Sequence, residues 1–216
     1  MQRLTLTFDN GPWADGATDE ILRTLLSHGI LATFFVVGNR LSDPAVLDIA
    51  QRAKAEGHLI GNHTFSHMQP LGLMDDIPAS IDEIVLAEEA LGTLAEANKL
   101  FRPPGKGRLG NHLLNRRAAD YLESAEYTVV TWNNVPRDWE DEDGSWVDRA
   151  LRTGATQDWS VLVVHDHHLK RLAGSLELFL DRALSAGIKF VQGFPAECTP
   201  MLRGERLPNF ADYVRQ

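Results

Sequence analysis

Two adjacent polar residues, Asp9 and Asn10, follow a short apolar run near the start of the chain. Residues 4–6 are typical of a β-strand, and Gly11 and Pro12 predict a turn directly after it. Both polar side chains are therefore expected at the carboxyl end of the first strand, where the turning chain lets them reach one site. A carboxylate there can act as a base, and an amide or carboxylate oxygen can coordinate a metal ion.

Two histidines, His63 and His67, lie four residues apart. If the chain makes a helical turn there, both imidazoles share one face and can hold one metal ion; two surface histidines are the competing interpretation. A catalytic zinc ion needs three protein ligands and an open position for water. Either Asn10 or Asp9 is available as the third ligand, and the ion would acidify its water and polarise a carbonyl.

A hydrolytic site also needs a base, an acid and groups that orient them. Asp9 is the candidate base, and Arg102 is placed to pair with it and keep it ionised. His165 is the candidate acid, because an imidazolium donates a proton near neutral pH. Asp138 is the candidate partner that orients His165 and raises its pKa. Taken singly, each residue also has a structural interpretation, as an ion pair, a turn residue or a strand-end histidine.

The composition is that of an ordinary globular protein: 216 residues, 44% hydrophobic and 24% charged. The net charge of -9 argues against nucleic acid or an anionic membrane as the main partner. Cys198 is the single cysteine, so no disulfide within the chain and no cysteine-based zinc site is expected. No apolar run approaches the roughly 20 residues of a membrane span. The first strand begins at once without an apolar leader, which predicts a cytoplasmic protein, with prior removal of a signal peptide as the alternative.

Strand-like and helix-like segments alternate along the whole chain, which predicts a single α/β domain over residues 1–216 with a mostly parallel sheet. The expected strands are residues 4–6, 32–38, 58–61, 100–102, 127–132, 161–164 and 189–191. The expected helices are residues 18–27, 44–56, 80–97, 111–125, 146–153 and 175–186.

About seven strand-then-helix units suit a barrel, in which functional groups lie on the loops after the strands. The candidate residues share this placement just past an expected strand: Asp9, His63, Arg102, Asp138 and His165.

Six segments carry a resemblance to a known family, in its order and at plausible spacing. They are residues 7–12 (TFDNGP), 32–38 (ATFFVVG), 61–67 (GNHTFSH), 101–104 (FRPP), 138–139 (DW) and 162–166 (LVVHD). The chain resembles the polysaccharide deacetylase family, the NodB-homology group of carbohydrate esterase family 4. The resemblance implies a distorted (β/α)7 barrel and metal-dependent removal of acetyl groups from N-acetylated sugars.

The resemblance also implies a role for each matching residue. It implies Asp9 as the base and Arg102 as the residue that positions it, with His165 as the acid and Asp138 as its partner. His63 and His67 would be metal ligands. The backbone N–H of Gly105 would help to stabilise the oxyanion, and Trp139 would line the substrate site.

The sequence departs from the family pattern at three places. Asn10 stands where the family has an aspartate as third metal ligand, so a divalent ion, expected to be zinc, would be held less strongly. Gly105, Lys106 and Gly107 follow residues 102–104, where the family has an aromatic residue and then glycine. Loss of that aromatic wall predicts a more open site with an added positive charge. Val135 replaces an aspartate that the family often has.

The leading hypothesis is a metal-dependent hydrolase that removes an acetyl or other acyl group from an N-acylated sugar or related small amide. One alternative is a cytoplasmic hydrolase of a small amide or cyclic imide, either with or without a metal. The other is a carbohydrate-binding homologue with an impaired site. All three leave the acyl group and the oligomeric state open.

Overall fold

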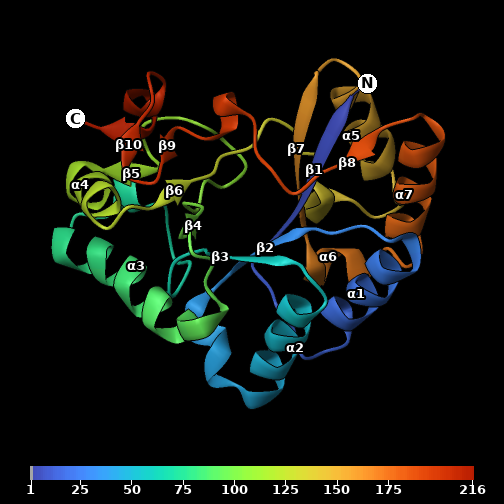
Figure 1. The fold of residues 1–216 in the computed structure, drawn as a ribbon, viewed down its shortest axis with the longest axis horizontal. Coiled ribbons are helices and arrows are strands. Elements are labelled where there is room, and N and C mark those ends of the chain that lie inside the picture. The colour runs from blue at the N-terminus through green and yellow to red at the C-terminus, as the bar shows by residue number, and fades with distance from the viewer. Residues whose placement is uncertain (1) are drawn as a thin grey trace.

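The computed structural model describes residues 2–216 and shows a curled, mostly parallel sheet with helices packed around it (Figure 1). The strands of this sheet are β1 (Arg3–Asp9), β2 (Thr33–Val36), β3 (Leu59–Asn62), β4 (Leu100–Phe101), β6 (Thr128–Val129), β7 (Trp159–His165), β8 (Lys189–Phe190), β9 (Met201–Leu202) and β10 (Glu205–Arg206). A separate pair joins β5 (Leu114–Asn115) to β11 (Val214–Arg215). The helices are α1 (Ala17–His28), α2 (Pro44–Ala55), α3 (Ile77–Leu91), α4 (Arg116–Ser124), α5 (Trp146–Gly154), α6 (Asp166–Lys170) and α7 (Ser175–Ser185). None of these helices within residues 2–216 has the length and hydrophobicity of a membrane span.

The strand order is β10-β9-β6-β4-β3-β2-β1-β7, with β8 also pairing to β1. The two sides of the curl meet where Asn134, after β6, forms a parallel bridge with Leu162 of β7. The predicted α/β fold of the distorted barrel type is therefore confirmed. The carboxyl ends of β1, β2, β3, β4 and β7 lie at one rim, because all their pairings are parallel.

Strand β1 shows how the sequence pattern positions the rim. Successive side chains of a strand point to opposite faces, so Leu6 and Phe8 pack into the core beneath the helices. Thr7 and Asp9 point to the inside of the curl and are almost fully buried there. Because of this alternation, the side chain at the end of β1 on the inside of the curl is the carboxylate of Asp9 and not an apolar group.

Several helix boundaries differ from the predicted ones for identifiable reasons. Gly16, in a left-handed conformation, precedes α1, so Thr18 does not cap this helix and instead donates to Asp166. Helix α3 starts before residue 80 and ends at Leu91, because the next residue, Gly92, has a φ of 50° that is unsuitable for a helix. Helix α4 starts only at residue 116, because the Asn115 side chain caps it by accepting from Ala118 N at 2.8 Å. The short elements β5, α6, β9, β10 and β11 were not predicted, and β5 occupies residues that were expected to be helical.

Candidate active site

A cavity of 260 Å³ opens at the rim where the parallel strands end. Most of the predicted site residues line it: Asp9, Asn10, His63, His67, Gly105, Trp139 and His165. Arg102 and Asp138 lie behind the wall, and both are 0% exposed. The structure therefore brings all nine predicted residues to one place, with seven at the surface of the cavity and two supporting them.

Asp9 is held by a buried guanidinium. Arg102 Nη1 donates to Asp9 Oδ1 at 2.8 Å and to Thr7 Oγ1 at 2.7 Å. The other guanidinium nitrogens donate to the carbonyls of Val130 and Thr131, so several N–H groups of this buried cation have acceptors. Only one Asp9 oxygen is used by Arg102, which leaves Oδ2 directed away from the ion pair, 3.7 Å from His63 Nε2.

The pKa of Asp9 is set by opposing effects. Burial raises the pKa of its carboxyl, but Arg102, His63 and His165 lower it by more, so the pKa lies below its usual value. Asp9 is therefore ionised at neutral pH although it is only 5% exposed. An ionised, oriented carboxylate with one free oxygen is suited to accept a proton.

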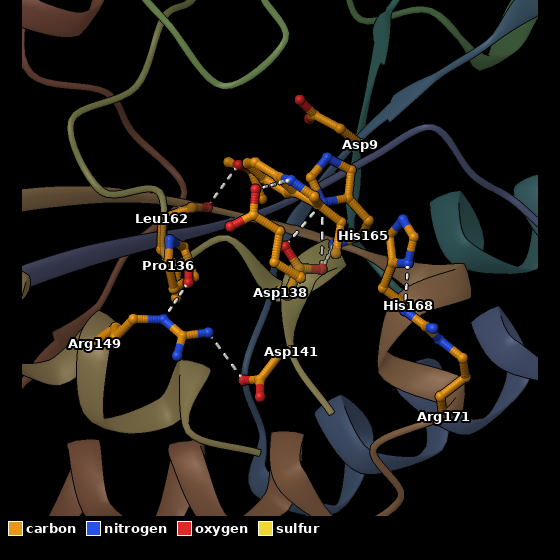
Figure 2. Close-up of polar contacts among 12 residues, drawn as sticks. Asp9, Pro136, Asp138, Asp141, Arg149, Leu162, His165, His168 and Arg171 are labelled. Carbon is orange, nitrogen blue, oxygen red and sulfur yellow. Dashed lines mark hydrogen bonds and ion pairs between the residues drawn. The ribbon is translucent and has the colours of Figure 1, made fainter. Parts of the chain in front are cut away.

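His165 is held by Asp138 through two hydrogen bonds (Figure 2). The His165 backbone N–H donates to Asp138 Oδ2 at 2.8 Å, and ring Nδ1 donates to Oδ1 at 2.9 Å. Burial lowers the pKa of His165, but the Asp138 carboxylate, its hydrogen bond and Asp9 raise it by more, so the pKa lies above its usual value. The ring is thus oriented, and its protonated form is favoured, as a general acid requires.

The loop that presents Asp138 is braced by helix α5 (Figure 2). Arg149 Nε donates to the Pro136 carbonyl at 2.6 Å, and its Nη2 donates to Asp141 Oδ2 at 3.1 Å. Asp141 also accepts from the backbone N–H of Trp146 at the start of α5. Sequence reasoning missed Arg149 and Asp141, because nothing local in their segments indicates a contact with the loop before Asp138.

His63 and His67 come together without the helical turn that their spacing suggested. Residues 63–69 contain no helix, and Thr64 and His67 have φ values of 67° and 55° in the left-handed region. The two rings nevertheless lie 4.7 Å apart between centroids. Burial lowers the pKa of His63, and burial and the neighbouring His63 lower the pKa of His67 to about 3. Both imidazoles are neutral, the form that binds a metal ion.

The donor set fits a divalent cation. His63 Nδ1 donates to the Arg102 carbonyl at 2.7 Å, so its Nε2 carries the lone pair toward the cavity. Asn10 lines the same cavity, and its Oδ1 is buried without a hydrogen-bond partner in the described chain. Within residues 2–216 no three His, Cys, Asp or Glu side chains converge as a metal site, which leaves the Asn10 amide as the candidate third donor beside His63 and His67.

Asp166 lies buried beneath the turn that carries Asn10. Its Oδ2 accepts from Thr18 Oγ1 at 2.5 Å, and Thr18 Oγ1 accepts from Trp13 N at 2.9 Å. A Cβ at Gly11 would collide with the Asp166 carboxylate, so only glycine lets the turn approach so closely. Burial raises the pKa of Asp166 to about 6. The sequence motifs contained Asp166 and Gly11, but these residues are far apart in the sequence and their contact was not predicted.

The wall beside Gly105 is closed by Trp132, contrary to the expectation of an open site. A Cβ at Gly105 would collide with the Trp132 indole, so this ring occupies the space next to the missing side chain. Trp139 stands against Gly107 and packs edge-on to His165, with centroids 5.4 Å apart. No acceptor within residues 2–216 takes the Gly105 backbone N–H, which is therefore free for a ligand.

Of the two other nearby histidines, His168 lines the cavity from α6. Its Nδ1 accepts from Arg171 Nη2 at 3.0 Å, and burial lowers its pKa (Figure 2). His167 lies beside Trp13 and away from the cavity.

Comparison with known proteins identifies the family of this chain. The family profile described as polysaccharide deacetylase matches residues 2–130. The chain belongs to the polysaccharide deacetylase family.

Among its relatives, the chitooligosaccharide deacetylase of Rhizobium leguminosarum bv. trifolii is 32% identical over 166 residues, covering 76% of this chain and 72% of that protein. The peptidoglycan-N-acetylglucosamine deacetylase PgdA of Listeria monocytogenes serotype 1/2a is 29% identical over 192 residues, which are 88% of this chain. The chain spans only 38% of the length of that relative. The crystal structure of the Bc1960 peptidoglycan N-acetylglucosamine deacetylase with a bound N-oxidanyl-benzamide superposes with a TM-score of 0.73 at 27% identity, over 93% of this chain and 89% of that one.

Replacing Arg102 with Met is expected to leave the Asp9 carboxylate buried without a partner. The free energy of unfolding should fall by ~3–5 kcal/mol at pH 7, measured by urea denaturation. Adding Asp9→Asn to the same chain should recover part of that loss, because the buried charge is then gone. The exposed Arg108→Met serves as control and should change little. A double variant as unstable as Arg102→Met would show that packing, not charge, causes the loss.

Replacing Asp138 with Asn should lower the pKa of His165, because the amide keeps a hydrogen-bond acceptor but loses the negative charge. A pH titration of the His165 ring by NMR measures this, with Glu142→Gln in the same loop as control. The raised pKa also means that His165 stabilises the fold fully below its ordinary value of 6.5, and loses this contribution as pH rises through the raised value. An unchanged titration in Asp138→Asn would exclude Asp138 as the cause.

Proposed function

We propose that the protein is a hydrolase that removes an acetyl or other acyl group from the nitrogen of an N-acylated sugar. One observation carries the proposal: a base and an acid with oppositely shifted pKa values lie side by side at one cavity. The register of β1 and β7 pairs Asp9 directly with His165. Each has its own buried partner, Arg102 for Asp9 and Asp138 for His165.

Asp9 is the base of the proposed reaction. Its Oδ1 is fixed by Arg102, and the free Oδ2 accepts a proton from the water that attacks the acyl carbonyl. The Arg102 guanidinium keeps the carboxylate ionised before the reaction and in the correct rotamer during it. Because both groups are buried, bulk water does not compete for this hydrogen bond.

His165 is the acid. Its Nδ1–H remains on Asp138, so the Nε2 proton is the one available to the departing amine. The free N–H of Gly105 is placed on the cavity wall, where it stabilises the negative charge that develops on the carbonyl oxygen. Trp139 offers an apolar face beside His165 on which a sugar ring can rest.

Asn10, His63 and His67 would hold a divalent cation, and zinc suits this mixture of nitrogen and oxygen donors. When bound, the ion supplies polarisation of the acyl carbonyl and acidification of water. The neutral amide of Asn10 binds a cation less strongly than a carboxylate, so we expect weak affinity.

The substrate class is supported by relatives whose names specify peptidoglycan N-acetylglucosamine and chitooligosaccharides. These substrates share an acetamido group on a sugar ring, which is the group that an acid, a base and an oxyanion donor would hydrolyse. We therefore place the substrate among N-acetylated sugars.

Replacing Asp9 with Asn or His165 with Gln is expected to lower kcat for an N-acetylated chitooligosaccharide by about 10²–10⁴-fold, because each removes one proton transfer. Acetate release measures the rate, and circular dichroism checks the fold. The distant His28→Gln should retain full activity.

Retained turnover in both site variants would refute this mechanism. Turnover of small amides or cyclic imides by the unaltered protein in excess chelator, with none of acetylated sugars, would favour the metal-independent alternative. Tight sugar binding without turnover under any metal would favour the binding homologue.

Replacing Asn10 with Asp should tighten zinc binding by about tenfold or more, because an anionic oxygen replaces a neutral one. Competition with a chromophoric chelator measures this affinity without any assay of activity. Asn39→Asp adds the same charge at an exposed position and should leave the affinity unchanged. Equal affinities for the natural chain and Asn10→Asp would remove Asn10 from the ligand set.

A further inference from the structure

The loop that follows Pro104 places one cation at the mouth of the cavity. Residues 105–108 form a tight turn closed by a hydrogen bond from Arg108 N to the Gly105 carbonyl at 3.0 Å. Lys106 and Gly107 have φ values of 50° and 71°, the pattern of a type I′ turn. Asn and Gly are favoured at the first of these positions, so a lysine there is conformationally costly.

Two indoles fix this turn in place. Trp132 stands against Gly105, and a Cβ at Gly107 would approach Trp139 to 2.8 Å. Neither glycine can therefore carry a side chain without moving a tryptophan. Lys106 is the one residue of the three whose side chain extends from the turn, and it lines the cavity.

Lys106 is an exposed residue whose charge has no ion-pair partner in the part of the chain that the structure describes. No carboxylate lies within 4.0 Å of its ammonium among residues 2–216, and no hydrogen-bond acceptor takes its protons there. The single carboxylate on the cavity wall, Asp9, is already paired with Arg102. The cavity therefore presents an unpaired cation although the chain as a whole carries a net charge of -9.

We propose that Lys106 is a specificity residue that binds an anionic group, a carboxylate or a phosphate, carried by the N-acylated sugar. The inference rests on the proposed function and adds the charge of its substrate. Because the lysine side chain is flexible, its ammonium group can reach an anionic substituent at any of several positions on the sugar ring. Trp132 and Trp139 line the same cavity, and aromatic side chains there can pack against the apolar face of the same ring.

The test compares three probes that share an acetamido group: N-acetylglucosamine, N-acetylmuramic acid with its carboxylate, and N-acetylglucosamine 6-phosphate. Dissociation constants are measured by NMR titration, and kcat/KM by acetate release. Lys106→Asn removes the charge and suits the left-handed conformation of the turn, so the loop is retained. Arg108→Gln removes a neighbouring exposed charge that does not line the cavity and is the matched control.

We expect the unaltered protein to bind at least one anionic probe about three- to tenfold more tightly than the neutral sugar. Lys106→Asn should abolish this difference and leave the dissociation constant of the neutral sugar unchanged. Arg108→Gln should bind all three probes as the unaltered protein does. The preferred probe tells a carboxylate from a phosphate ligand. Equal binding of all three probes, or equal weakening of all three by Lys106→Asn, would overturn the inference. Charge-selective binding without turnover of any probe would retain the role of Lys106 and refute the proposed hydrolase.

Discussion

The buried pair of Arg102 and Asp9 is the interaction on which the rest of the site depends. A guanidinium is expensive to remove from water, and here it is tolerated because Asp9, Thr7 and two backbone carbonyls accept its protons. The pair joins β4 to β1 inside the curl. The carbonyl of the same residue accepts from His63 Nδ1, so Arg102 controls both the ionisation of Asp9 and the tautomer of a candidate metal ligand.

The second organising feature is that two buried carboxylates receive different cationic partners. Asp9 faces a permanently charged guanidinium, and Asp138 faces a titratable imidazole. The first arrangement lowers the pKa of the proposed base, and the second raises the pKa of the proposed acid. In the proposed reaction, opposite shifts at adjacent strand ends let one residue accept a proton and the other donate one at the same pH. The parallel register of β1 and β7 is what places them next to each other.

The sequence predicted those features that depend on local pattern. The position of Asp9 and His165 at strand ends was predicted, because parallel strands bring their carboxyl ends to one rim. The left-handed conformations of Thr64 and His67 were not, since neither residue type indicates a positive φ. The support of Gly11 by Asp166 depends on a contact across most of the chain, which local propensity does not encode.

The charges of the cavity, taken together, determine which ligands it favours. Asp9 and Arg102 neutralise each other, as do Asp138 and a protonated His165, and the imidazoles of His63 and His67 are uncharged. An aspartate in place of Asn10 would balance the remaining cation, Lys106. With the amide at that position, the exposed Lys106 on the cavity wall has no carboxylate partner among residues 2–216. The two departures at residues 10 and 106 therefore act in the same direction, towards a negatively charged ligand.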